Sequence, residues 1–420
     1  MFASKLVALG SSNRSSKRSS KKTVFSIITI FVLLGLNACG GGTTTTTPTT
    51  NTPAVSLSAA SKAYVNLDIA NLANYASPTL PPFYTDPAVI ALDNTPANNP
   101  ATNAKATLGR VLFYDRRLSR TDTVACANCH SQAEAFSDGD QFSTGFTPVG
   151  GNAGLTGAHS MRLANIRYYR PGTAFWDKRA ASVEAQSTQP IQHAVEMGFD
   201  TANGGFAAVI TKMNTLPYYP ELFTFAFGDT AVTETRVQQA LAQYMRSIVS
   251  VNSKWDTGYA LNYDASLADK GRSLAIASFT ASEERGRQLF INPPTPGGVG
   301  LGCAGCHVPP TFALTATSQS NGLDAGETKI FKAPSLKNAG VAGRFMHDGR
   351  FATLNEVVEH YASGVKLGAA LDNRLITPAG AARTLPNLTA ADKIALVAFL
   401  QTLTDTALPT DTKFSSPFVQ

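Results

Sequence analysis

The apolar residues of this chain recur mostly at helical spacing. The stretch 106–114 is apolar enough to predict a helix, and Val237, Leu241, Tyr244 and Ile248 return every three or four residues, which marks one face of a second helix. Few windows alternate apolar and polar residues as a half-buried strand does. The pattern therefore predicts a mainly α fold with extensive loops.

Three further helices are predicted from their capping residues. In each case a Thr is followed three residues later by an acidic residue, which is the capping-box pattern of a helix N-terminus. The pairs are Thr280 with Glu283, Thr353 with Glu356, and Thr389 with Asp392. The predicted helices run to Ile291, to Gly364 and to about Leu403.

The N-terminal residues 1–38 are typical of an export signal. A basic stretch precedes an apolar run from Val24 to Leu36, and small residues stand before Cys39. Because a bilayer needs about 20 apolar residues, this run is short for a membrane span, although an uncleaved anchor helix is the alternative. The letters LNAC at 36–39 resemble a bacterial lipoprotein box, which predicts a lipid attached to Cys39. Two acyl chains would hold the protein on a membrane surface.

Composition divides the rest of the chain. Residues 39–55 are rich in Gly, Thr and Pro and predict a flexible linker. Residues 56–104 predict a loosely helical N-terminal arm. The remainder is expected to form two mostly helical, cytochrome c-like domains, 105–275 and 276–410, each around one Cys-x-x-Cys-His pentad, which suggests a duplication.

The net charge of +6 comes from the signal alone. Residues 1–38 hold six of the 35 Lys and Arg and no acid, which leaves 29 basic residues against 29 acidic ones in the mature chain. The sequence therefore gives no reason to expect a nucleic-acid partner.

The five cysteines comprise Cys39 and the four of the two pentads, so no disulfide is expected. In this spacing two thiols meet the two vinyl groups of a haem, and the following His reaches the iron. A dithiol redox pair or half of a zinc site are the alternatives, but zinc would need another Cys or two more well-placed His. Two covalently bound haems c are therefore predicted, held by Cys126, Cys129 and His130 and by Cys303, Cys306 and His307.

Several motifs in order along 106–403 resemble those of the bacterial diheme cytochrome c peroxidase and MauG family. They read LGRVLFYD at 108–115, CANCH at 126–130, FWDKRA at 175–180, EMG at 196–198, FKAPSLKN at 331–338 and HDG at 347–349. The resemblance implies a peroxidatic haem in the first domain and an electron-transfer haem in the second.

The same resemblance implies three catalytic residues. Trp176 would lie between the haems, and Gln186 and Glu196 would lie on the distal side of the first haem. A carboxyl in a dry pocket suits peroxide cleavage, because a proton has to move from the near oxygen to the far one. A surface acid and an ordinary core aromatic are the alternatives for Glu196 and Trp176. His193 is expected to be a hydrogen-bonded wall residue, with a distal base as the alternative.

One departure from the family concerns the first iron and calcium. Many relatives carry a distal His before the Trp motif, but residues 141–158 contain none, so this iron is expected to be open at rest. His159 stands where relatives have an Asn near a calcium ion between the haems. The other calcium ligands would be the backbone carbonyls of Ala342 and Arg344.

A second departure concerns the second iron. Peroxidases of the family carry a Met where this chain has Tyr361, as MauG does. Leu354, Val357, Val358 and Tyr361 share one helix face, so Tyr361 is predicted to point at the haem. An oxygen ligand would favour ferric and higher states. Met346 and His360 are alternative ligands, and a packed Tyr361 without iron contact is a further alternative.

The expected protein is a periplasmic, lipid-anchored diheme peroxidase. It would reduce hydrogen peroxide with electrons from a periplasmic donor such as a small cytochrome c or a copper protein. A MauG-like oxidase of aromatic residues on a partner protein is the first alternative. The second is a diheme electron carrier, which would have no use for a carboxyl in an apolar distal pocket. The sequence predicts no oligomeric state.

Overall fold

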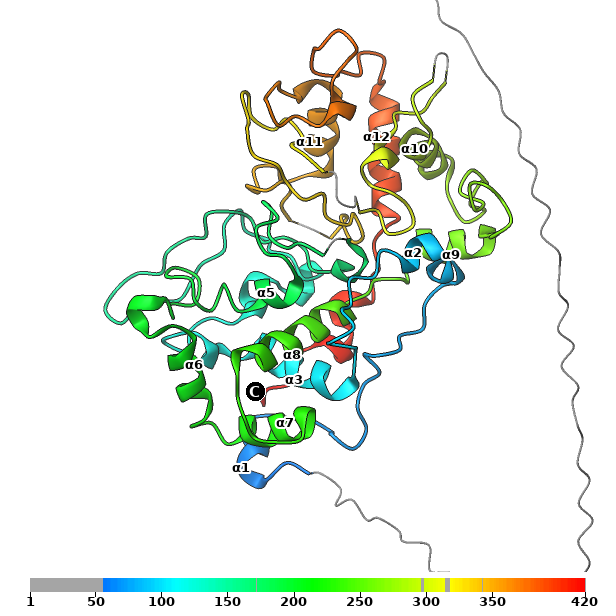
Figure 1. Ribbon diagram of the computed structural model, residues 1–420. Coiled ribbons are helices and arrows are strands. Elements are labelled where there is room, and N and C mark those ends of the chain that lie inside the picture. The colour runs from blue at the N-terminus through cyan, green and yellow to red at the C-terminus, as the bar shows by residue number, and fades with distance from the viewer. Residues whose placement is uncertain (1–55, 171, 296–297, 314–317, 342, 420) are drawn as a thin grey trace, which may run out of the picture. The chain divides into compact units, whose positions relative to one another are not determined.

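The computed structural model describes residues 56–170, 172–295, 298–313, 318–341 and 343–419 (Figure 1). The predicted signal, the linker, Cys39 and Ala342 lie outside these residues. Among the described helices, none is both long enough and apolar enough to cross a bilayer.

The described residues are mainly helical and form isolated bridges but no sheet, as the apolar spacing predicts. Short 3₁₀ turns and long loops connect the α-helices, and one π-helical turn, His360–Gly364, follows α11. The α-helices are α1 Ala59–Lys62, α2 Pro87–Ile90, α3 Asn103–Tyr114, α4 Cys126–Cys129, α5 Val183–Ser187, α6 Gly205–Met213, α7 Tyr218–Phe227, α8 Glu234–Ser247, α9 Lys254–Asn262, α10 Ala281–Ile291, α11 Leu354–Glu359 and α12 Ala390–Gln401.

The predicted helix starts are confirmed. Thr280, Thr353 and Thr389 are the N-caps of α10, α11 and α12, and each accepts a hydrogen bond from the backbone N–H three residues later. The arm holds the short helices α1 and α2, the 3₁₀ helix Pro82–Thr85 and the first two residues of α3. Capping pairs therefore predict where the helices of the second half begin, whereas composition alone does not predict the positions of the helices in the arm.

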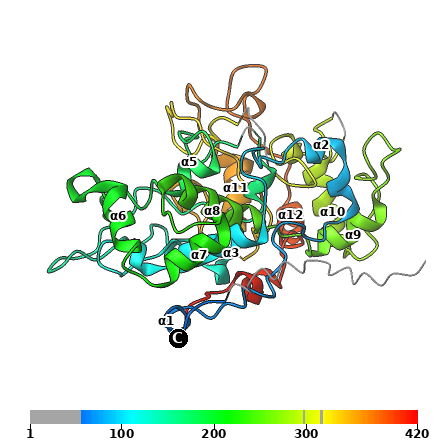
Figure 2. The ribbon, with the colours of Figure 1, turned by 60° about the horizontal axis from the view of Figure 1, so that its bottom comes forward.

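Two helix pairs, α3 with α8 and α10 with α12, organise the fold (Figure 1, Figure 2). At both crossings a glycine lets the backbones touch. A Cβ on Gly109 would lie 2.0 Å from the Ala240 carbonyl oxygen, and one on Gly286 would lie 1.9 Å from that of Ala395. Arg-x-Leu-Phe follows the glycine in α3 and in α10. The repeated contact supports the expected duplication.

The buried side chains form two hydrophobic clusters, one around each helix pair. The first includes Leu112 and Leu241, and the second includes Leu289 and Phe399. The arm contributes to both clusters, with Tyr75 in the first and the residues 83–84 in the second. The two clusters fit two haem domains, while the boundaries 105–275 and 276–410 stay a prediction.

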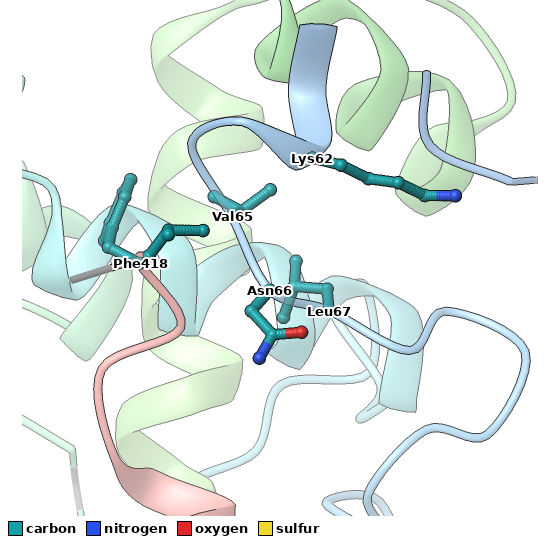
Figure 3. A pocket seen from close by; sticks show the side chains of 6 residues that line it. Lys62, Val65, Asn66, Leu67 and Phe418 are labelled. Carbon is teal, nitrogen blue, oxygen red and sulfur yellow. The ribbon is translucent and has the colours of Figure 1, made fainter. Parts of the chain in front are cut away.

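The arm also pairs with the C-terminal segment. The Asn66 N–H donates to the Pro417 carbonyl at 2.8 Å, and the Val419 N–H donates to the Tyr64 carbonyl at 2.9 Å. A hollow on this pairing is lined by Lys62, Val65, Asn66, Leu67, Phe418 and Val419 (Figure 3). The two ends of the described chain therefore hold each other against the first cluster.

We expect Gly286→Ala to lower the free energy of unfolding by about 1–3 kcal/mol, because the added methyl group overpacks the contact of α10 with α12. Gly157→Ala is the control, since a Cβ there would meet nothing within 4 Å. Chemical denaturation of the haem-loaded variants measures the difference. Equal stabilities of the two variants would contradict the glycine contact.

Candidate functional site

Two loops of the same design carry candidate redox residues. The segments 174–180 and 345–351 are each closed by an isolated bridge between their first and last residues. Their third residues are Trp176 and His347, and a capped helix, α5 or α11, follows at the same spacing. The two halves therefore place an aromatic side chain at equivalent positions, as the expected duplication predicts.

Trp176 lies where the two halves meet. Its indole N–H donates to the His159 carbonyl at 2.7 Å, and its own carbonyl accepts the Lys332 N–H at 2.7 Å. The ring centroids of Trp176 and His347 are 6.5 Å apart. These contacts hold the indole at the wall of the cavity beside the second pentad.

The first pentad begins with helix α4. The His130 N–H donates to the Cys126 carbonyl at 2.9 Å, and burial lowers the pKa of the His130 imidazole to about 4. Burial raises the pKa of the Cys126 thiol to about 12 and that of Cys129 to about 11. A reactive dithiol pair needs a low thiol pKa, so these values disfavour the redox alternative. A neutral imidazole is the form that binds iron.

The second pentad opens onto a large cavity. The His307 Nδ1 lies 3.3 Å from the Phe312 carbonyl oxygen, and burial lowers the pKa of the imidazole to about 4. A hydrogen bond at Nδ1 leaves Nε2 free for a metal. The cavity wall includes both thiols and an apolar set, Phe290, Leu336, Leu354, Val358, Leu396 and Leu400. This lining fits a flat apolar macrocycle attached at the pentad.

Two cations that line this cavity, the buried Lys332 and the half-buried Arg162, form no ion pair with a carboxylate among the described residues. Burial and the charge of Lys178 lower the pKa of Lys332 to about 7, and its ammonium donates to the Thr173 carbonyl at 3.0 Å. Burial lowers the pKa of Arg162 to about 10. Since a buried charge is costly without a counter-charge, an anion is expected here, and haem propionates supply one. Lys332 stands in a recognised motif, but sequence reasoning assigned it no role.

Glu196 lies at the first pentad. Burial raises the pKa of its carboxyl, while the charges of His193 and Arg179 oppose the rise. The carboxyl is near enough to Cys126 and Cys129 to raise the pKa of both thiols. A half-buried acid with a raised pKa is suited to holding and passing a proton.

The two other candidate distal residues, His193 and Gln186, differ in their bonding. The His193 Nδ1 accepts the Glu196 backbone N–H at 3.3 Å and lies 3.6 Å from its carboxyl. This contact favours the role of a wall residue for His193. The Gln186 amide, on α5, forms no side-chain hydrogen bond with the described chain, so it is free to bind a ligand.

Helix α5 is fixed by a buried ion pair. Both terminal nitrogens of Arg246 donate to the Glu184 carboxylate, at 2.6 and 2.7 Å, and its Nε donates to Asn94 at 2.7 Å. Burial alone would raise the pKa of Glu184, but Arg246 and Asn99 hold it below the usual value. Since the helix is a single short turn, this pair positions Gln186.

Tyr361 lies in the π-helical turn after α11 and lines the cavity of the second pentad. Burial raises the pKa of its phenol, which is therefore neutral in the absence of a metal. Met346 also lines the cavity, and its sulfur accepts the Asn321 amide at 3.1 Å. His360 is bonded to the Asn321 carbonyl and is absent from the described cavity wall. The geometry favours Tyr361 and Met346 over His360 as iron ligands.

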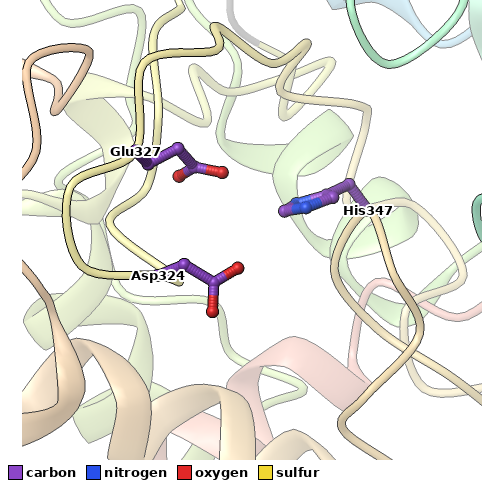
Figure 4. A group of neighbouring side chains, drawn as sticks. All are labelled: Asp324, Glu327 and His347. Atoms are coloured by element: carbon purple, nitrogen blue, oxygen red, sulfur yellow. The ribbon is translucent and has the colours of Figure 1, made fainter.

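The described residues include one group of metal-ligand types, Asp324, Glu327 and His347, whose ligand atoms lie within 4.8 Å of one another and converge in Figure 4. Arg350 donates to both oxygens of Asp324, at 2.9 and 3.0 Å. Of the residues expected at the calcium, His159 donates its backbone N–H to the His347 carbonyl at 3.0 Å and its ring lies 3.1 Å from the Asp140 carbonyl, while Arg344 lines the cavity. The calcium site therefore stays a prediction.

Comparison with known proteins identifies the family. Residues 103–264 and 280–374 match the family described as di-haem cytochrome c peroxidase. The chain belongs to this family. It is 31% identical to the methylamine utilization protein MauG of Methylophilus methylotrophus over 74% of the chain and 86% of that protein. It is 28% identical to the cytochrome c551 peroxidase of Nitrosomonas europaea over 63% of the chain and 74% of that protein.

Solved structures agree with this membership. A MauG-like protein associated with microbial copper homeostasis is 26% identical and matches with a TM-score of 0.60 over 83% of this chain and 98% of that chain. The diheme peroxidase BthA from Burkholderia thailandensis, at 20% identity, shares the fold with a TM-score of 0.55 over 76% of this chain and 90% of that chain. The family brings two haems c, which the two pentads can hold.

We expect Arg246→Met to lower the free energy of unfolding by about 3–5 kcal/mol, because it leaves Glu184 as an unpaired buried charge. The control is Arg236→Met on the same helix. Arg236 also binds a carboxylate through two nitrogens, but its partner Asp229 is 57% exposed, against 16% for Glu184. A similar loss in the free energy of unfolding of both variants would show that the Arg246–Glu184 pair stabilises the protein no more than an exposed pair does.

Proposed function

We propose that this protein reduces hydrogen peroxide to water with electrons from a periplasmic donor. As a member of the di-haem cytochrome c peroxidase family it is an oxidoreductase that acts on peroxide. The observation that carries the proposal is Glu196, a carboxyl with a raised pKa beside the first pentad. An electron carrier would gain nothing from a proton donor at this place.

In this proposal each pentad holds one haem. Cys126 and Cys129 bind the first covalently, Cys303 and Cys306 bind the second, and the histidine of each pentad holds its iron. The haems supply the redox chemistry. Lys332 and Arg162 are proposed to neutralise propionates. Release of either haem by acid–acetone would contradict its attachment.

Glu196 is proposed to move the proton that peroxide cleavage requires. Burial shifts its pKa upward, which favours the protonated carboxyl, and its proximity to both thiols of the first pentad supports a place beside the first haem. The free amide of Gln186 is proposed to orient the peroxide. Trp176 is proposed to carry electrons between the two halves, since its indole lies at their junction.

We expect Glu196→Gln to slow peroxide turnover by a factor on the order of 10² to 10⁴ while both haems stay bound, because a positioned acid–base group contributes about that much. Stopped-flow measurement of peroxide consumption tests this. Glu221→Gln is the control, since that carboxylate bonds to the arm at Ser58. Unchanged turnover in Glu196→Gln would remove the residue from the reaction.

A MauG-like oxidase of aromatic residues on a partner protein is a second candidate. Tyr361 at the cavity of the second pentad favours it, as does the absence of His from 141–158. An oxygen ligand would make the second iron a store of oxidising equivalents, and an open first iron would react without prior reduction. The two candidates differ in what is oxidised after peroxide reacts.

We expect the resting protein to lack the near-infrared band of a His/Met haem, because the Tyr361 oxygen is the proposed sixth ligand. Tyr361→Met should raise the reduction potential of the second haem, since a thioether favours the reduced state. Redox titration and near-infrared spectra measure both effects. If the parent protein already shows the His/Met band, Met346 is the ligand and the peroxidase proposal stands without its MauG-like alternative.

The proposal includes export to the periplasm and a lipid at Cys39, which lies outside the described residues. Retention of Cys39→Ser on the membrane would contradict the lipid. It also includes a calcium ion between the haems, near His159 and the carbonyls of Ala342 and Arg344. Because His is a poor ligand for calcium, backbone oxygens would provide most of the site. Unchanged haem spectra after chelation would count against it.

A further inference from the structure

We propose that Trp255, Tyr259 and Tyr263 form an electron-transfer route from the second pentad to the surface, where Tyr263 with Asp86 is a site of one-electron oxidation. The inference rests on the proposed peroxide reduction, because peroxide is the oxidant. The site would serve an external one-electron reductant.

The inner end of the route is one aromatic layer away from the cavity. Phe290 lines the cavity wall, and its ring centroid lies 5.2 Å from that of Phe399. Phe399 is 5.7 Å from Trp255, and Phe312 is 5.2 Å from Trp255. The Phe312 carbonyl is also the partner of the His307 Nδ1. Since tunnelling falls steeply with distance, this packed layer connects Trp255 to the second pentad.

Three redox-active side chains then follow one another. Trp255 and Tyr259 stand four residues apart on one face of α9, and Tyr263 is the residue that ends the helix. The Trp255 and Tyr259 rings stack with centroids 5.1 Å apart and planes at 25°. The Tyr259 and Tyr263 centroids are 6.1 Å apart. Trp255 and Tyr259 are buried, whereas Tyr263 is partly exposed, so the route runs from the core to the surface.

The hydrogen-bond partners change along the route in the order that charge transfer requires. The Trp255 indole N–H is buried without a partner, so this ring can lose an electron but has no base to take its proton. The Tyr259 hydroxyl donates to the Lys270 carbonyl at 3.0 Å, which is also no base. The Tyr263 hydroxyl donates to the Asp86 carboxylate at 3.2 Å. Only at Tyr263 can the proton leave with the electron.

Hydrogen bonding within the arm fixes the position of the Asp86 carboxylate, the proposed proton acceptor of Tyr263. Its second oxygen accepts the Ala88 N–H at 2.9 Å as the N-cap of α2, which lies beside α9 (Figure 1). The Lys270 ammonium lies 3.8 Å from the same oxygen that Tyr263 contacts. This charge keeps the carboxylate available as an acceptor without replacing the phenol.

The electron balance is simple. Reduction of one peroxide to two waters consumes two electrons and two protons. When no donor is present, Tyr263 supplies one of the two electrons through Tyr259 and Trp255, and the bound haems would supply the other. The two protons for water come from solvent, and the phenol proton of Tyr263 passes to Asp86. The products are a neutral tyrosyl radical and a protonated Asp86 carboxyl. A one-electron reductant then returns the electron, and the proton goes back to the phenol oxygen.

The test is electron paramagnetic resonance of the haem-loaded protein, frozen after mixing with hydrogen peroxide without a donor. We expect a tyrosyl signal in the parent protein and its loss in Tyr263→Phe. Trp255→Phe keeps the ring packing but removes the redox step, and Asp86→Asn keeps a good N-cap but removes the base. Both should also lose the signal. Tyr64→Phe is the matched control, because Tyr64 is partly buried but packs in the first cluster.

The haem absorbance of each sample separates the possible failures. If peroxide changes the haem spectrum but the parent shows no tyrosyl signal, or Tyr263→Phe keeps it, the route is wrong and the proposed function stands. Loss of the signal in Tyr64→Phe alone would place the oxidised residue in the first cluster and overturn the route. If peroxide leaves the haem spectrum unchanged, the proposed function falls and the route falls with it.

Discussion

The close contact of two helix backbones is the constraint on which the rest of this structure depends. In each half a glycine without a side chain allows the contact, Gly109 against Ala240 and Gly286 against Ala395. The chain leaves α3 and α10 at the end of this contact and reaches its pentad soon afterwards. Because the direction of each helix is fixed there, the place of each Cys-x-x-Cys-His is fixed with it.

The two halves share the same loop and helix arrangement but carry different functional side chains on it. The third residue of the bridged loop is Trp176 in the first half and His347 in the second. The helix after the loop presents Gln186 with a free amide in the first half, whereas the second continues into a π-helical turn with Tyr361 at the cavity. π-Helical turns are frequent at functional sites. The two halves therefore present different side chains near their pentads, an amide in the first and a phenol in the second.

Two buried lysines of the same motif differ in their partners. One forms an ion pair within the polypeptide, whereas the other lies beside the cavity without a carboxylate. Lys337 and Asp256 are both fully buried and bond to each other, which joins the FKAPSLKN motif to the start of α9. Lys332 lies five residues earlier in the same motif and finds a carbonyl oxygen and the face of the Tyr169 ring, but no carboxylate among the described residues. Since a buried ammonium is costly without a counter-charge, an anion in the cavity would stabilise the folded chain at this place.

Sequence reasoning succeeded where the determining chemistry is local. Thr280 caps α10 because its partner, Glu283, is three residues away, and Tyr361, expected from helical spacing to share a face with Leu354, lines the same cavity as Leu354, while its role as a ligand stays a prediction. The contact of Asp86 with Tyr263 has no local signal, since it joins the arm to the end of α9 across 177 positions. Composition made the arm look like a passive extension, yet it supplies the carboxylate that gives Tyr263 a proton acceptor. The arm, whose apolar residues show no helical spacing, thus supplies the proposed proton acceptor for Tyr263 at the end of α9. From the sequence alone, α9 would be read as a core helix.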